Sequence, residues 1–349
     1  MADDLPSCVA EVLSEMEFDR LFCLTDSTTL RVCWPLIGGL PVMRDACMIT
    51  IGDTDENKSV DSLLHVWESL QRGGATRHSL LVNLGGGMVT DLGGFAASTF
   101  KRGIRFVNIP TTLLALVDAS VGGKTGINLG GLKNEVGVFN CSECVLLASD
   151  FLGTLDDRNL LSGYAEMLKH GLLDGREHLY ELLAFDPTDV RSGDDMAGRD
   201  LVRMVGHSVA VKERIVEEDP MERGIRKALN LGHTAGHAIE GLAMMEERTV
   251  LHGYAVAWGM VMELYLSVVK CGFPSAVFHQ VEGYVREHYG KFWYECRHYD
   301  RLLEFMKHDK KNVGETVNFS LLGDVGDIRI NMTCDVREIE QMLDYYREN

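Results

Sequence analysis

Three histidines and one glutamate in the second half of the chain have side chains that can bind a transition metal. His233 and His237 are four residues apart, so a helix would place both on one face, and His252 follows after a short gap. Glu166 adds a carboxylate from an earlier segment. Imidazole nitrogen and carboxylate oxygen are ordinary ligands of Zn²⁺. A zinc site and a set of ordinary core or surface histidines are both compatible with this spacing.

The histidine pair does not match the zinc-protease motif. That motif, HExxH, has a glutamate directly after the first histidine, whereas Thr234 stands there in this chain. A protease of that type is therefore disfavoured.

A glycine run, Gly85–Gly87, follows an apolar segment and precedes a stretch with helical character. Glycines let the backbone approach a phosphate, and a helix N-terminus offers free N–H groups. The run does not match the GxGxxG fingerprint, and a tight structural turn accounts for it equally well. Dinucleotide binding and a plain turn both remain open at this point.

A second glycine-containing motif, Gly122-Gly123-Lys124-Thr125, resembles the end of a P-loop. The P-loop motif requires a glycine at position 118, where this chain has Asp118. Lys124 is joined by Lys133 and Arg102 as cations in a glycine-rich part of an acidic protein. Each cation alone could be solvated surface charge, but together they favour an anion-binding site.

The pattern of elements predicts two domains. Up to residue 150, short apolar runs at 19–24, 46–51 and 79–84 alternate with a helical pattern at 59–73, which indicates a parallel sheet with crossover helices. From residue 151 onward the chain is predicted to be mostly helical. The expected helices are 158–174, 199–218, 226–245, 252–271, 275–289 and one from 336, with short strands at 316–322 and 327–331 and a surface connection at 186–198.

Composition excludes several classes of protein. The 349 residues carry a net charge of −18, which argues against binding nucleic acid or an anionic membrane surface. Nine cysteines without regular spacing indicate a reducing compartment, and Cys141–Cys144 is a single CxxC pair where a zinc ribbon needs two. The apolar run 254–269 is too short to span a bilayer and predicts a buried helix, and residues 1–17 have no apolar signal core. We expect a cytoplasmic protein.

Taken together, the motifs resemble the sugar-phosphate cyclases, and most of all the 3-dehydroquinate synthase family. The segments 85–137, 163–171, 229–240 and 251–262 have the order and spacing of that family, and the resemblance covers roughly residues 50–330. It implies an α/β N-terminal nucleotide-binding domain (1–150) with a Rossmann-like parallel sheet. A mostly α-helical C-terminal domain (151–349) would bind metal and substrate.

The resemblance also implies cofactors and site residues. NAD and a divalent metal, Zn or Co, would be bound, with Glu166, His233 and His252 as the metal ligands. The implied NAD contacts are Asp26, Asp55, Lys58, Gly86, Gly87, Asp91, Thr111, Thr112, Leu114, Lys124, Lys133, Phe151, Thr154 and Leu155. The implied catalytic residues are Lys169, His237, Asn230, Lys124 and Asp118. The implied substrate contacts are Arg102, Lys133, Asn134, Lys212, Glu222, Arg226 and Lys310.

The implied reaction converts 3-deoxy-D-arabino-heptulosonate 7-phosphate to 3-dehydroquinate and phosphate, in the shikimate pathway that leads to chorismate and the aromatic amino acids. It proceeds by transient oxidation by NAD, β-elimination of phosphate, re-reduction and intramolecular aldol closure. A substrate with a carboxylate and a phosphate accounts for the cations in an acidic chain. The resemblance further implies a homodimer, with Arg102 and Glu222 reaching a neighbouring subunit or the edge of the cleft.

Three alternatives are another sugar-phosphate cyclase, a metal-dependent polyol dehydrogenase of the same architecture, and a descendant without catalytic activity. The retained metal ligands and Lys169 argue against the last. One position departs from the family pattern: His252-Gly253 is followed by Tyr254, where the family usually has glutamate. Tyr254 could alter the surroundings of the neighbouring ligand.

Overall fold

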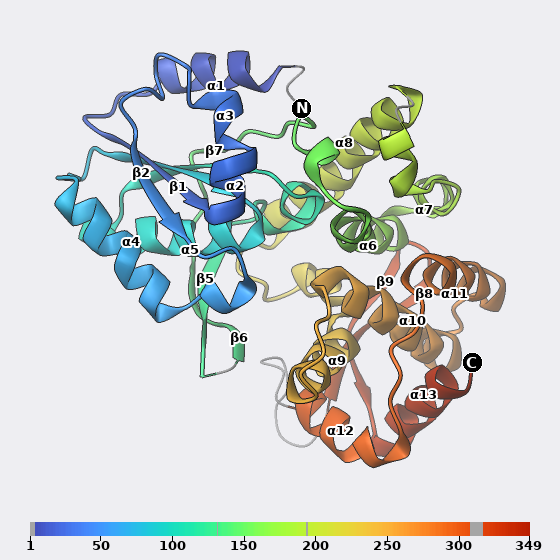
Figure 1. Ribbon diagram of the computed structural model, residues 1–349. Helices are drawn as coiled ribbons and strands as arrows, with labels where there is room; N and C mark the ends of the chain where they lie inside the picture. Colours follow the sequence, from blue (N-terminus) through green and yellow to red (C-terminus); the bar gives the residue numbers. More distant parts are fainter. Residues whose placement is uncertain (1–3, 131, 193–194, 308–316) are drawn as a thin grey trace. The chain divides into compact units, whose positions relative to one another are not determined.

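The computed structural model describes residues 4–130, 132–192, 195–307 and 317–349 (Figure 1). The chain forms two compact units. Unit 1 comprises Met1–Asp156 and Gly198–Val209, and unit 2 comprises Asp157–Ala197 and Ala210–Asn349. The division into functional domains after residue 150 stays a prediction.

The centre of unit 1 is a parallel sheet, as the sequence predicts. Its order among the described residues is β2-β1-β3-β4-β7, and each neighbouring pair is parallel. Strands buried on both faces read as continuous apolar runs, and every residue of β1 and β3 is buried. The strands are β1 (Leu21–Asp26), β2 (Cys47–Ile51), β3 (Leu80–Gly85), β4 (Arg105–Pro110) and β7 (Cys144–Val145).

Helices cover both faces of this sheet, and a separate hydrophobic core lies between the sheet and the helices on each face. On one face α4 (Val60–Arg72) and α5 (Gly87–Thr99) pack against Phe22 and Leu81. The other face, with Cys23, Leu80 and Val82, packs against α1 (Leu5–Ser14) and neighbouring residues of α2 (Ser27–Val32) and α3 (Trp34–Ile37). Sequence patterns do not predict α1, which Asp4 caps by accepting the Ser7 N–H at 3.0 Å.

Between β4 and β7 the chain forms a short π-helix, Ala115–Ala119, and an antiparallel ribbon of β5 (Lys124–Leu129) and β6 (Leu132–Phe139). The bend before the ribbon needs glycine because Gly122 and Gly123 have φ angles of 97° and 67°.

Unit 2 is mostly helical. It contains α6 (Asp157–Asp174), α7 (Arg176–Leu183), α9 (His233–Met245), α10 (His252–Cys271), α11 (Ser275–Tyr289), α12 (Tyr299–Lys307) and α13 (Val336–Glu348), with the hairpin β8 (Val317–Asp324) and β9 (Asp327–Cys334). The helix α8 (Asp195–Glu218) has residues in both units. Helix α10 is long and apolar enough to cross a membrane, but 67% of its most apolar window is buried inside the protein, which confirms the predicted buried helix.

Two predicted elements differ from the structure. The helix predicted at 226–245 is interrupted: Ile225–Asn230 is a 3₁₀ helix, and α9 begins only at His233. The interruption falls at Gly232, whose φ is 79° and where a Cβ would lie 2.6 Å from Met260 Cγ. The predicted connection at 186–198 contains the 3₁₀ helix Pro187–Ser192 and the start of α8 at Asp195.

Candidate active site

Helix α6 carries a charged pair in the core of unit 2. Glu166 and Lys169 are three residues apart and are exposed by only 0% and 1%, and the Lys169 ammonium is paired with Glu166 Oε2. Removing two charges from water costs several kcal/mol for each ion, which only close pairing offsets. A buried pair of this kind marks a candidate functional site, because burial without a function would only cost stability.

Two histidines converge on the other oxygen of Glu166. His233 and His252 are the first residues of α9 and α10, and their Nε2 atoms lie 3.5 and 3.4 Å from Glu166 Oε1. Ligands on a tetrahedral Zn²⁺ with bonds of about 2.1 Å are separated by about 3.4 Å. The three side chains therefore have the donor types and spacing of a divalent-metal site.

His237 lies beside this trio. Its ring centroid is 5.4 Å from that of His233 and 5.9 Å from that of His252, and the residue is exposed. Donor atoms of His237, Glu240 and His252 also lie within 4.8 Å of one another. The pair at positions 233 and 237 thus shares one side of α9, and His233 is the member that meets the buried Glu166.

Glu240 is a site residue that the sequence analysis missed. Its Oε1 lies 3.4 Å from His252 Nδ1, while His252 Nε2 faces Glu166, so the two carboxylates hold the ring from both sides. Glu240 stands seven residues after His233, which is two helical turns, and this spacing could have identified it. Carboxylates in this position commonly orient metal-binding histidines.

The electrostatics of the trio favour a cation. Burial lowers the pKa of the His252 imidazole, but the Glu240 and Glu166 carboxylates outweigh burial and raise that pKa to about 10. On the neighbouring helix, His233 Nδ1 lies 3.2 Å from the Leu231 carbonyl oxygen. A proton on Nδ1 would donate to that carbonyl and leave Nε2 available toward Glu166.

The 3₁₀ helix before α9 holds an almost fully buried arginine. The Arg226 side chain is 1% exposed, and its NH1 donates to the Pro220 carbonyl at 2.6 Å. The Asp219 carboxylate accepts the N–H groups of Arg223, Gly224 and Arg226 at 2.9, 2.6 and 3.1 Å. Burial raises the pKa of Asp219, but these N–H groups outweigh it and lower the pKa. The Asp219 carboxylate therefore joins the backbone of residues 223–226 to the end of α8.

The remaining predicted substrate contacts of unit 2 follow. Asn230 Nδ2 donates to Glu222 Oε1 at 2.8 Å, and Glu222 has a left-handed backbone with φ of 57°. Such a backbone is strained for a residue other than glycine and is often found at functional sites. Lys212 is buried on α8, and Lys310 lies outside the described residues.

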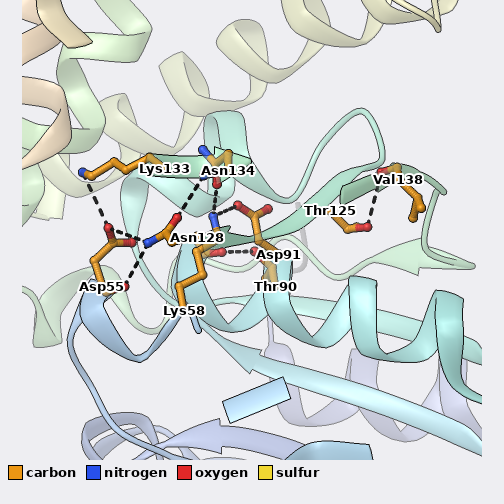
Figure 2. A network of polar contacts seen from close by, with 10 residues as sticks. Asp55, Lys58, Thr90, Asp91, Thr125, Asn128, Lys133, Asn134 and Val138 are labelled. Atoms are coloured by element: carbon orange, nitrogen blue, oxygen red, sulfur yellow. Dashed lines mark hydrogen bonds and ion pairs between the residues drawn. The ribbon is translucent and has the colours of Figure 1, made fainter. Parts of the chain in front are cut away.

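Unit 1 holds a second polar network, which Figure 2 shows. The buried Lys58 ammonium donates to Asp91 on α5 and to Asn134 on β6. Asn128 donates to the Asp55 carbonyl at 3.2 Å and accepts the Asn134 N–H at 2.9 Å. Lys133 Nζ lies 3.6 Å from Asp55 Oδ2. Five predicted site residues thus lie in one network, in which Asn128 links Asp55 to Asn134. The sequence holds no signal for Asn128.

The glycine run joins the carboxyl end of β3 to α5. Gly86 is the N-cap of α5, and a Cβ there would lie 3.1 Å from Thr112 Cγ2. A Cβ on Gly87 would lie 3.0 Å from the Ala119 Cβ. The Thr111 N–H donates to the Gly85 carbonyl at 3.0 Å. The glycines therefore bring α5 close to the segment after β4, with the first N–H groups of α5 at the same edge of the sheet.

The other predicted residues of unit 1 lie on several elements. Asp26 ends β1 and caps α2, because its Oδ1 accepts the Thr29 N–H at 2.7 Å. Burial raises the pKa of Asp26. Arg102 is exposed and has φ of 68°. The rest are placed as follows: Leu114 immediately before the π-helix, Asp118 within it, Lys124 at the start of β5, Phe151 in the core, and Thr154 and Leu155 just after Phe151.

Comparison with known protein families shows to which family the chain belongs. Residues 48–162 match the family model described as 3-dehydroquinate synthase N-terminal, and residues 163–312 match the one described as 3-dehydroquinate synthase C-terminal. The chain belongs to the 3-dehydroquinate synthase family. The two matches meet inside α6, four residues before Glu166.

Relatives named 3-dehydroquinate synthase match most of the chain. The protein of Parabacteroides distasonis is 53% identical over 346 residues, 99% of this chain and 96% of its own length. That of Pyrococcus furiosus is 40% identical over 271 residues, 77% of each chain. The fold of the 3-dehydroquinate synthase family is shared with the solved 2-epi-5-epi-valiolone synthase of Streptomyces hygroscopicus (25% identity, TM-score 0.86, 97% and 93% of the two chains). It is also shared with 2-deoxy-scyllo-inosose synthase (23% identity, TM-score 0.80, 99% and 95%).

Proposed function

We propose that this chain converts 3-deoxy-D-arabino-heptulosonate 7-phosphate to 3-dehydroquinate and phosphate, as a carbon–oxygen lyase of the shikimate pathway. The observation that carries the proposal is the trio Glu166, His233 and His252, in a chain that matches the 3-dehydroquinate synthase of Parabacteroides distasonis over 99% of its length. The trio has the donor set of a divalent-metal site, and the paired Lys169 lies at the same carboxylate.

The cofactors would be NAD and Zn²⁺ or Co²⁺. The solved valiolone synthase is described with NAD⁺ and Zn²⁺, and the scyllo-inosose synthase with NAD⁺ and Co²⁺. When bound, the metal would supply Lewis acidity toward a substrate alcohol, and NAD would supply reversible hydride transfer at that alcohol. Glu166, His233 and His252 would hold the metal, and Glu240 would orient His252.

Residues of unit 2 would bind and orient the substrate. Lys169 can donate hydrogen bonds beside the metal ligands, and the exposed His237 can exchange a proton with the substrate. The deeply buried Arg226 and Lys212 carry the positive charge that a carboxylate and a phosphate require. The proposed substrate set is completed by Asn230, Glu222, Arg102, Lys133, Asn134, Lys124, Asp118 and Lys310.

Residues of unit 1 would bind NAD. The N-terminus of α5 after Gly86 and Gly87 offers N–H groups to the pyrophosphate, and the buried Lys58 sets the position of Asp91. The proposed NAD contacts also include Asp26, Asp55, Thr111, Thr112, Leu114, Phe151, Thr154 and Leu155.

We also propose that the chain works in the cytoplasm as a homodimer. Each residue of β6 from Asn134 to Phe139 is exposed, including Val136, Val138 and Phe139 at 37%, 37% and 46%. Exposed apolar edge strands favour pairing with another strand, which supports self-association. Light scattering coupled to gel filtration tests this: a mass of 38.8 kDa at micromolar concentration would refute it.

The reaction is tested with the heptulosonate phosphate, catalytic NAD⁺ and Zn²⁺ or Co²⁺, by measuring inorganic phosphate and dehydroquinate together. Both products should appear in equal amounts, without net NADH. The second candidate, a cyclase for another sugar phosphate, is favoured by the structural similarity to the valiolone and inosose synthases. Phosphate release from a different sugar phosphate, and none from the heptulosonate, would decide for that candidate.

A further inference from the structure

Helix α9, which begins with the proposed metal ligand His233, is capped by a residue of another helix. The first N–H groups of any helix have no partner within it. Here the Gly232 N–H donates to Glu263 Oε2 at 2.8 Å, and the Ala235 N–H donates to Glu263 Oε1 at 3.0 Å. Glu263 lies in the middle of α10 and is 0% exposed.

The packing of α9 on α10 explains why the cap comes from outside. A Cβ on Gly259 would lie 2.0 Å from the Gly232 carbonyl oxygen, and a Cβ on Gly236 would lie 2.8 Å from the Ala255 carbonyl oxygen. The two backbones therefore touch. Gly232 cannot be replaced by a serine or aspartate cap, because its backbone is left-handed and Met260 fills the space of a Cβ.

We infer that Glu263 is a positioning residue for the metal site. His233 stands between the two N–H groups that the Glu263 carboxylate holds, so this carboxylate sets the direction in which His233 leaves the helix. Ser267 extends the connection, since its Oγ donates to the Glu263 carbonyl at 2.8 Å and accepts the Leu322 N–H of β8 at 3.1 Å.

The inference rests on the proposed function, because it concerns the metal that Glu166, His233 and His252 would hold. It goes beyond that function, because Glu263 acts on the backbone of α9, where it accepts the N–H groups of Gly232 and Ala235. Mutating a residue that orients a metal ligand without binding the metal itself typically lowers metal affinity 10- to 100-fold.

The test measures Co²⁺ affinity of the full-length protein by competition with a chromophoric chelator, together with the d–d absorption bands of the Co²⁺ form. E263Q keeps the volume but only one accepting oxygen, and we expect roughly tenfold weaker Co²⁺ binding and altered bands. E263A should weaken binding further, up to about 100-fold. The matched control is E282Q, because Glu282 on α11 accepts from the Tyr345 hydroxyl at 3.0 and 3.2 Å, and no change is expected there.

The results separate the inference from the function it rests on. If E263Q folds and keeps the wild-type Co²⁺ affinity and absorption bands, the positioning role of Glu263 is refuted. This holds even if E263A does not fold. A wild-type protein that binds no Co²⁺, or a His233→Ala variant that binds it normally, overturns the proposed metal site and the inference with it. Weakened binding in E263Q but not in E282Q supports the positioning role.

Discussion

Replacing Glu240 by glutamine should remove a pH-dependent contribution to the stability of the metal-free protein. The Glu240 and Glu166 carboxylates raise the pKa of His252 from 6.5 to about 10, against the effect of burial. A group whose pKa is raised on folding stabilises the folded state fully below its unfolded pKa, and this contribution is lost as pH rises through the folded pKa. The contribution of His252 is therefore present at pH 6 and is gone above about pH 10.

The size of the effect follows from the pKa. Each tenfold change in proton affinity corresponds to about 1.4 kcal/mol, so a rise from 6.5 to about 10 sets an upper bound of several kcal/mol. The His252 side chain is 27% exposed, and solvent screens part of this interaction. Glu166 retains a share of it, so we expect E240Q to lose on the order of 2 kcal/mol at pH 6. For a unit of 150 to 250 residues, this is a fall in Tm of roughly 4 to 8 °C.

The assay is thermal unfolding of wild-type protein and E240Q in the presence of a chelator, from pH 5.5 to 10.5. The difference in Tm should be largest near pH 6 and should disappear above pH 10. E287Q serves as the control, because Glu287 is an exposed residue of α11. A Tm difference for E240Q that is constant across this range, or a His252 pKa by NMR that is unchanged in E240Q, would refute the reasoning.

Three further predictions concern both units. His233→Ala should abolish Zn²⁺ binding, whereas His237→Ala should keep the metal and lose turnover; equal metal content by atomic absorption would contradict this assignment of the two histidines. Lys58→Ala should weaken NAD⁺ binding in calorimetry and lower stability by about 0.5–1.5 kcal/mol, because it removes the hydrogen bonds that Lys58 donates to Asp91 and Asn134. Gly259→Ala should destabilise by about 1–3 kcal/mol, since the new methyl group would lie 2.0 Å from the carbonyl oxygen of Gly232, the residue before α9.

The glycine prediction has a matched control within the same unit. A Cβ on Gly283 of α11 would meet nothing within 4 Å, so Gly283→Ala should be neutral or stabilising, as alanine favours a helix interior. A Gly259→Ala variant as stable as wild type would show that α9 and α10 can separate at little cost. If Lys58→Ala lowers the Tm but leaves NAD⁺ affinity unchanged, Lys58 has a structural role and does not contribute to NAD⁺ binding.

The amino-acid sequence by itself determined the local features of this protein. The strands β1, β2 and β3 are predicted from runs rich in apolar residues, the pattern of strands buried on both faces, and every residue of β1 and β3 is buried. The strands β4 and β7 of the same sheet are not predicted. The bounds of α10 and α11 are predicted because their apolar residues recur at helical spacing up to a glycine at each C-terminal end. The metal-binding residue types, and the helical spacing of His233 and His237, are visible in the same way.

The tertiary structure alone decided which of these residues meet. Gly232 interrupts the predicted helix at 226–245 because the backbone of α10 touches it there, and Glu263, 31 residues further along, caps the helix that follows. Lys58 reaches Asn134 across 76 residues, and Asn128 completes that network. Local sequence patterns do not predict such pairs, because a contact between residues far apart in the sequence depends on how whole helices and strands pack. The histidine pair illustrates the difference between sequence and tertiary structure. The spacing of His233 and His237 places both on one side of α9, but only the packing of α9 against α6 brings His233 to Glu166.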